Sequence, residues 1–226
     1  MYALSTTLAV PHGAEWLALG LSYLLGAVPF SWLLARMLKG VDIRTVGSGN
    51  IGSTNAARVL GKPLGIVAFL LDFAKGWLPV AVIARKFYEG TAGSPGAYAF
   101  GALCGVAAVV GHVWPIYLKF KGGKAVATTA GMAVAIDPLV FLIGGFGWLA
   151  VKYGVGFVGL ASMLMCALFP LGAAWQISTG SVHYDNGVVW VLCALALLVV
   201  IRHRGNIQRM LAGTEPRGGR TQEEHR

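Results

Sequence analysis

The stretch AVATTAGMAVAIDPLVFLIGGFGWLAV, residues 125–151, decides how this chain folds. It is apolar enough for lipid, where a helix needs about 20 residues to cross the hydrocarbon. Asp137 and Pro138 interrupt it, because proline removes a backbone donor and disfavours helix at the residue before it. We therefore expect two shorter helices here. The alternative leaves part of 125–175 re-entrant or lying flat on the membrane.

The rest of the chain is equally apolar. Of its 226 residues 56% are hydrophobic and only 12% are charged, and the mean hydropathy is +0.68. A soluble domain carries about 25% charged residues, which argues against a water-soluble globule. Apolar segments fall at 16–38, 63–84, 97–118, 125–151, 155–175 and 187–201. We predict an all-α, polytopic integral membrane protein, with one transmembrane domain over 1–211 and a polar, disordered cytoplasmic tail over 212–226.

The distribution of charge predicts the orientation. Eighteen Lys and Arg against nine Asp and Glu give a net charge of +9. In a soluble protein this excess would raise nucleic acid as a partner, but in a membrane protein cationic loops mark the cytoplasmic side. Basic residues gather in 36–62, in 119–124 and after residue 201, whereas 1–15 and 176–186 have none. An outer N-terminus and a cytoplasmic C-terminus require an odd number of crossings, so we favour seven transmembrane helices over five.

The first polar loop has the composition of an anion site. It reads GSGNIGSTN over 47–55 and is followed by Arg58. Glycines at this density allow successive backbone N–H groups to face one point as a nest, and an arginine fork suits phosphate. A flexible polar turn is the plain alternative. The letters GxGxxG, with Asp72 further on, match a dinucleotide fingerprint, but that motif needs a βαβ unit and the flanks here are membrane segments.

Two further clusters follow along the chain. The second contains His112 and then KGGK over 121–124, where N–H groups of a Gly-Gly-Lys turn and the Lys124 ammonium can hold a second anion; a positively charged anchor at a span end is the alternative. The third places His203, Asn206 and Arg209 one helical turn apart, on one face. An arginine cluster beside a membrane also binds anionic lipid heads.

Asp72 and Lys75 lie one turn apart inside an apolar segment. Charges at that depth are costly and are normally paired, so a structural ion pair is expected, with support of the substrate site as the sharper possibility.

Several kinds of chemistry lack their residues in this sequence. No histidine is followed by an acidic residue five positions on, and there is no Gly-x-Ser-x-Gly elbow, Walker lysine or carboxylate cluster for a metal. Cys104, Cys166 and Cys193 lie apart in apolar segments and give neither a disulfide framework nor a metal-ligand spacing. We expect no metal and no cofactor, and chemistry that relies on positioning and charge.

Together these motifs resemble the bacterial membrane acyltransferases of the PlsY family, which use acyl phosphate as donor. The resemblance covers nearly the whole chain and is carried by GSGNIGSTNAARVLGK at 47–62, DFAKG at 72–76, GHVWPIYLKFKGGKAVAT at 111–128 and HRGNIQRMLAGTE at 203–215. It implies a seven-helix protein of the cytoplasmic (inner) membrane, with its active site at the cytoplasmic face. It also implies transfer of a fatty acyl group from acyl phosphate to the 1-hydroxyl of glycerol 3-phosphate, giving lysophosphatidic acid. A soluble enzyme that makes the donor is a further expected partner, and nucleic acid is not.

The resemblance also assigns residues. It implies an acyl-phosphate pocket at Ser48, Gly49, Asn50, Gly52, Thr54 and Asn55. It implies catalytic roles for Arg58, Lys124, His203 and Asn206, which bind and orient glycerol 3-phosphate. Supporting roles fall to Asp72, Lys75, His112, Lys121, Gly122, Gly123, Ser162, Arg209 and Glu215. The donor's own phosphate is implied as the base. This sequence departs from the family pattern in Ser53, which replaces a usual alanine, and in Ala161, which stands before Ser162 where a serine is frequent.

Two other classes stay open from the sequence. A transporter of a phosphorylated metabolite also uses glycine-rich breaks in membrane helices, although no inverted pair of broken helices is evident. A lipid-binding structural protein is the third possibility, and it leaves the glycine-rich segment 47–55 without a purpose.

Overall fold

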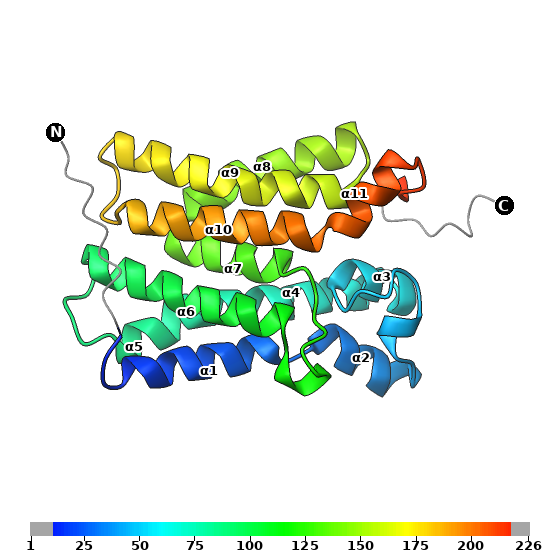
Figure 1. The fold of residues 1–226 in the computed structure, drawn as a ribbon, viewed down its shortest axis with the longest axis horizontal. Helices are drawn as coiled ribbons and strands as arrows, with labels where there is room; N and C mark the ends of the chain where they lie inside the picture. The colour runs from blue at the N-terminus through cyan, green and yellow to red at the C-terminus, as the bar shows by residue number, and fades with distance from the viewer. Residues whose placement is uncertain (1–10, 218–226) are drawn as a thin grey trace.

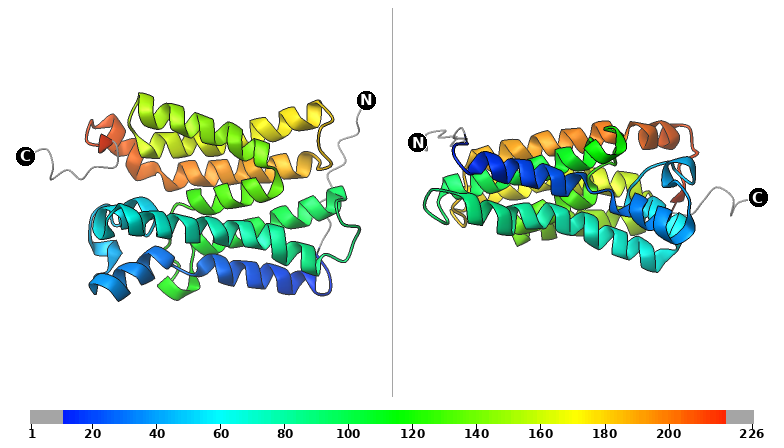
Figure 2. Two further views of the ribbon diagram at one scale, coloured as in Figure 1. Left: turned by 180° about the vertical axis from the view of Figure 1, so that it is seen from behind. Right: turned by 90° about the horizontal axis from the view of Figure 1, so that it is seen from below.

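The computed structural model describes residues 11–217, and every regular element in that range is helical. Successive long helices run back and forth along one axis, as Figure 1 shows, and Figure 2 shows the same bundle from behind and from below. The elements are α1 (Glu15–Ala27), α2 (Phe30–Lys39), η1 (Ile43–Thr45), α3 (Ser53–Leu60), α4 (Lys62–Leu78), the π-helical η2 (Pro79–Ala84), α5 (Arg85–Phe87), α6 (Pro95–Val113), η3 (Ile116–Leu118), α7 (Val126–Ile136), α8 (Pro138–Gly154), α9 (Val158–Ser178), α10 (Asn186–Arg202) and α11 (Arg204–Leu211).

Length and composition identify the helices that can cross a membrane. Among the described residues four stretches are long and apolar enough: Glu15–Lys39, Lys62–Phe87, Pro95–Leu118 and Val158–Ser178. The pair α10 and α11, bent by 53°, makes a fifth if it is one broken span, and α7 and α8 are shorter apolar helices. The prediction of a polytopic, all-helical membrane protein is therefore confirmed in outline, while the count of seven and the orientation of the termini stay predictions.

The break expected at Asp137 is present, and it divides 125–151 into α7 and α8. Asp137 is buried and ends one helix while it caps the next: its carboxylate accepts the backbone N–H of Leu139 at 2.8 Å and the hydroxyl of Tyr184 at 2.9 Å. The side-chain amide of Gln176 donates to the same group. At about 1.5 Å per residue the 11 residues of α7 are too short to cross the hydrocarbon. These three donors offset the cost of a carboxylate held inside the bundle.

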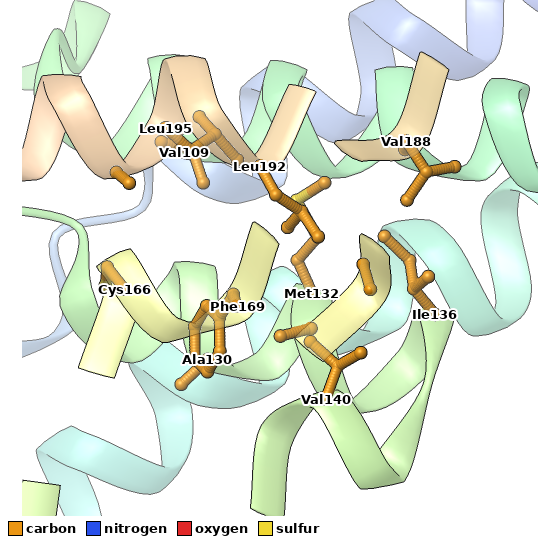
Figure 3. Close-up of a cluster of buried hydrophobic side chains, with 14 of the residues drawn as sticks. Val109, Ala130, Met132, Ile136, Val140, Cys166, Phe169, Val188, Leu192 and Leu195 are labelled. Carbon is orange, nitrogen blue, oxygen red and sulfur yellow. The ribbon is translucent and has the colours of Figure 1, made fainter. Parts of the chain in front are cut away.

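Helix pairs hold the bundle together through apolar side chains. α1 packs on α6, α4 on α7, α8 on α9 and α9 on α10. The main core lies where α6, α7, α8, α9 and α10 meet, and Figure 3 shows its central side chains Val109, Met132, Val140, Phe169 and Leu192.

Two glycine contacts set how closely the helices approach. A Cβ on Gly26 would collide with the backbone of Ala108, so only glycine lets α1 lie this close to α6. A Cβ on Gly76 would collide with the carbonyl of Thr128, which fixes α4 against α7 in the same way. Such close contacts are the ordinary means of helix association in lipid.

The polar elements gather at one end of the bundle. In Figure 1 the helices α2, α3 and α11 all lie at the right-hand end, opposite the start of α1. The first and third sequence clusters therefore lie at the same end.

Candidate active site

A single large cavity joins the three clusters. Its volume is about 1240 Å³, which exceeds the usual size of a small-molecule site. Its polar lining comes from α3 and the loop before it, from α4, α6 and α9, from the loop before α7, from the junction of α10 and α11, and from the residues after α11. The predicted site residues that line it are Ser48, Asn50, Gly52, Thr54, Asn55, Arg58, Asp72, His112, Lys124, Ser162, His203, Asn206, Arg209 and Glu215.

The first loop is built around the amide of Asn55. This side chain is buried, and its Nδ2 donates to the carbonyls of Ile43, Val46 and Asn50 at 3.0–3.1 Å. Its Oδ1 accepts the N–H of Ser48 at 2.9 Å. Asn55 therefore shapes the loop from within, although it also borders the cavity.

The nest expected from the glycines is not formed as predicted. The N–H of Gly49 donates to the carbonyl of Val46 at 3.1 Å, and the N–H of Gly52 donates to Asn50 Oδ1 at 2.8 Å. With Ser48 N–H also engaged, these donors hold the loop itself. The donors toward the cavity are instead the hydroxyls of the lining residues and the first turn of α3, which begins at Ser53 and has N–H groups without intrahelical acceptors.

The Gly-Gly-Lys turn also differs from the expected anion nest. The N–H of Gly122 donates to Val113 O, and that of Gly123 to His112 O, both at 3.1 Å. A Cβ on Gly122 would collide with these carbonyls, and one on Gly123 would collide with the His112 ring. The glycines serve close packing against the end of α6, and neither lines the cavity. Lys124 alone reaches it from this loop.

Lys124 is a half-buried cation that lines the cavity. Its ammonium donates to Asn206 Oδ1. Burial, followed by the repulsion of nearby arginines with Arg209 foremost, lowers the pKa of Lys124 from 10.5 to about 8, and the attraction of Glu215 partly opposes this shift. Burial likewise lowers the pKa of Arg58, which stays charged because an arginine is not deprotonated in proteins. Cations held together and out of water favour a bound dianion.

The third cluster lies at the bend between α10 and α11. His203 occupies the break itself, with Nδ1 2.8 Å from Val199 O, so the neutral ring donates from Nδ1 and leaves Nε2 as an acceptor. Glu215 accepts from Asn206 Nδ2 at 2.6 Å and from Arg209 Nε at 2.7 Å. The predicted stripe of His203, Asn206 and Arg209 does line one cavity.

The predicted pair of Asp72 and Lys75 is present beneath the cavity. Lys75 Nζ lies 2.9 Å from Asp72 Oδ1 and donates to Val28 O at 3.0 Å, between α1 and α2. Both side chains are at most 3% exposed. His112 Nδ1 lies 3.9 Å from the same carboxylate oxygen, and Asp72 and His112 border the cavity. The pair thus joins the break in the first span to the floor of the site.

Three predicted residues contribute less than expected. Lys121 is exposed and lies outside the cavity lining, as does Gly49. Ser162 lines the cavity, but its hydroxyl donates to Val158 O at 2.8 Å within its own helix. Within the tail predicted over 212–226, Glu215 and Pro216 line the cavity. Residues 218–226 lie outside the described range.

Sequence reasoning missed the apolar half of the cavity. One side of α8 contributes two adjacent rows of residues to this lining. The first row is Phe141, Gly145 and Trp148, and the second is Leu142, Phe146 and Leu149. The spacing i, i+4, i+7 was a readable signal. Phe69 of α4 is 39% exposed and Phe146 is 68% exposed, although both line the cavity. Part of the apolar wall is therefore exposed at the surface of the bundle.

Fold and site together define an integral membrane protein whose cationic cavity continues into an apolar groove. A family profile described as glycerol-3-phosphate acyltransferase matches residues 16–213. A glycerol-3-phosphate acyltransferase of Anaeromyxobacter dehalogenans is 43% identical over 203 residues, covering 90% of this chain and 96% of that protein. The crystal structure of PlsY (YgiH), an integral membrane glycerol 3-phosphate acyltransferase, in the glycerol 3-phosphate form matches with a TM-score of 0.79 at 36% identity, covering 91% of this chain and 96% of that one. Its lysophosphatidic acid form matches with a TM-score of 0.77 at 35% identity, covering 91% and 95%.

These matches extend far beyond half of the chain. The chain belongs to the glycerol-3-phosphate acyltransferase family. It is an acyltransferase of the PlsY type, as the sequence motifs predicted.

Proposed function

We propose that this enzyme transfers a fatty acyl group from acyl phosphate to the 1-hydroxyl of glycerol 3-phosphate. The observation that carries the proposal is the shape of the cavity, whose cationic end and apolar wall are continuous. A donor with an anionic head and a fatty chain fits both halves at once, and the cavity also has room for a small phosphorylated acceptor.

The reaction needs no cofactor to balance. The 1-hydroxyl oxygen bonds to the acyl carbon, the bond from that carbon to the phosphate oxygen breaks, and the hydroxyl proton passes to the departing phosphate. The products are lysophosphatidic acid and hydrogen phosphate. Because the donor's phosphate takes the proton, the protein's part is to bring the two substrates together and to stabilise developing charge.

The residues divide between the two phosphates. Arg58 and Lys124 hold the phosphate of glycerol 3-phosphate, since they are half-buried cations that line the same cavity. Nε2 of His203 accepts a hydrogen bond from a glycerol hydroxyl, and Asn206 orients Lys124. The hydroxyls of Ser48 and Thr54, the amide of Asn50 and the first turn of α3 hold the donor phosphate.

The topology follows the alternating helices. We infer that the chain passes seven times through the bacterial inner membrane, because α1, α4, α6, α7, α8, α9 and α10 alternate in direction and the start of α1 and α11 lie at opposite ends (Figure 1). Of these passes α7 is a short one, buried in the bundle, that does not reach across the full hydrocarbon thickness. The excess of basic loops places the site end in the cytoplasm. There the soluble enzyme that makes the donor is the expected partner. The test is labelling of single cysteines, Gly93→Cys and Gly213→Cys, after replacement of the partly exposed Cys193. Labelling of Gly213→Cys from outside intact cells would contradict this orientation.

The activity is tested with purified protein in lipid nanodiscs, acyl phosphate and radiolabelled glycerol 3-phosphate. We expect labelled lysophosphatidic acid, with one phosphate released per product, and no product when acyl-CoA replaces acyl phosphate. Product from acyl-CoA alone would overturn the proposed donor. The sequence left a transporter open, and membership of an acyltransferase family does not favour it.

The site is tested with matched variants. Arg58→Ala and His203→Ala are expected to lower kcat/KM for glycerol 3-phosphate at least a hundredfold. Arg85→Ala and His183→Ala remove the same groups from exposed positions outside the cavity, and they are expected to keep normal rates. Near-normal rates in both site variants would show that the cavity is not where acyl transfer occurs.

A further inference from the structure

Arg202, the last residue of α10, forms hydrogen bonds to the loop that carries Lys124. Its Nε donates to Gly123 O at 3.2 Å and its Nη2 donates to Gly122 O at 3.0 Å. The guanidinium fork thus spans two successive carbonyls of the Gly-Gly turn, and Arg202 is absent from the residues that line the cavity.

The same two glycines are held from the other side by α6. Their N–H groups donate to the carbonyls of Val113 and His112, and neither glycine has room for a Cβ. The turn is therefore fixed on one side by the end of α6 and on the other by Arg202. Lys124 is the next residue, so these four hydrogen bonds fix the position of the backbone from which its side chain extends.

Arg202 also directly precedes His203. The end of α10 that presents the histidine to the cavity therefore carries the side chain that fixes the lysine loop. We propose that Arg202 is a positioning residue for acyl transfer. Through its hydrogen bonds to the carbonyls of Gly122 and Gly123, it keeps Lys124 at a fixed position relative to His203 and Asn206. The proposal rests on the function proposed for Lys124 above.

The chemistry of the side chain explains why arginine is needed. A planar guanidinium offers parallel N–H donors in a fixed geometry, whereas an ammonium is a point charge and does not reproduce the fork. Replacing Arg202 with lysine keeps the charge and loses the fork. Replacing it with glutamine loses both. The two variants therefore separate position from charge.

Charge gives a readout that a purely structural role would not move. The groups whose charges act on Lys124 are Arg209, Glu215, Arg58 and Arg202, and His203 lies in the field of Lys124. Removing the cation of Arg202 raises the pKa of Lys124 above about 8, because one repelling charge is lost. Arg202→Lys leaves that charge in place.

The experiment compares Arg202→Lys, Arg202→Gln and the control Arg204→Gln, which removes a charge from an exposed residue outside the cavity. We expect both Arg202 variants to raise KM for glycerol 3-phosphate at least tenfold, with KM for acyl phosphate changed less than twofold. The alkaline limb of kcat/KM for glycerol 3-phosphate is expected to stay near pH 8 in Arg202→Lys and to move to higher pH in Arg202→Gln. The control is expected to match the wild type.

Chemical rescue distinguishes loss of the guanidinium group from poor folding of a variant. Adding millimolar guanidinium to Arg202→Ala is expected to restore activity severalfold, whereas ammonium is expected to have no effect. Wild-type kinetics in Arg202→Lys, or equal losses for both substrates without guanidinium rescue, would overturn the positioning role. If wild-type protein makes no product from acyl phosphate, it is the proposed function that fails, and the two failures are thereby distinguished.

Discussion

The buried pair of Asp72 and Lys75 gives a prediction that the structure makes quantitative. Asp72→Asn keeps the shape of the side chain and removes its charge, so packing is unchanged. The Lys75 ammonium then keeps Val28 O, at 3.0 Å, the face of the Phe30 ring, 5.7 Å from its centroid, and a neutral amide oxygen in place of the carboxylate, but no negative charge. Its side chain is 1% exposed, so water does not replace the lost carboxylate.

Breaking a buried pair by removing one partner costs about 3–5 kcal/mol, because an uncompensated charge remains. For a protein of this size about 1 kcal/mol corresponds to 2–4 °C in melting temperature. We therefore expect Asp72→Asn to melt about 6–20 °C below the wild type. The double variant Asp72→Asn with Lys75→Met removes both charges, and it is expected to recover most of that loss.

The assay is thermal unfolding in lipid nanodiscs, with acyl transfer measured on the same samples. A melting temperature of Asp72→Asn within 2 °C of the wild type would refute the reasoning, as would a double variant less stable than either single one. Turnover then separates the two roles considered for the pair. A stable double variant with normal turnover makes the pair structural only, and a stable but slow one shows that it supports the site.

Three further outcomes are expected. KM for glycerol 3-phosphate should rise about tenfold per pH unit above pH 8, as Lys124 loses its proton, and Lys124→Arg should flatten this rise; a flat wild-type profile would exclude the lysine as phosphate ligand. Gly76→Ala should unfold at clearly lower temperature because its Cβ meets the Thr128 carbonyl, whereas Gly20→Ala, with open space around it, should not; equal melting would disprove the contact. Gly145→Leu projects into the cavity without a clash, so activity should fall at least tenfold more for long-chain than for short-chain donors, and an unchanged ratio would remove α8 from the acyl groove.

The sequence predicted the architecture well where local chemistry decides it. Asp137 and Pro138 correctly predicted the break between α7 and α8. Hydropathy located the long helices to within a few residues. The division of the first span was missed. Val28 and Pro29 separate α1 from α2, and the Lys75 ammonium that binds Val28 O comes from 47 residues away, which no local pattern reveals.

The site was predictable in its side chains and not in its backbone. Cations and amides beside glycines indicated Arg58, Lys124, His203 and Asn206, and these do line one cavity. The N–H groups of Gly49, Gly52, Gly122 and Gly123, which the glycine pattern assigned to bound anions, donate to acceptors within the protein. Composition gives the same signal for a glycine whose N–H faces a ligand and for one whose N–H binds a neighbouring carbonyl, as Gly123 does with His112. Only the packing of α6 against the loop separates the two.

Phe69 and Phe146 line the cavity and are exposed at the surface of the apolar bundle, so under the proposed function the cavity meets lipid on one side and water on the other. The proposed fatty donor would be present at a mole fraction of the bilayer, whereas the phosphorylated acceptor is dissolved in water and its amount is given per volume. The KM for the donor is therefore expressed as a mole fraction of the bilayer, and the KM for the acceptor as a concentration in water. Inert phospholipid added at constant enzyme and acceptor dilutes the fatty donor alone, so the membrane itself becomes a variable in the rate law.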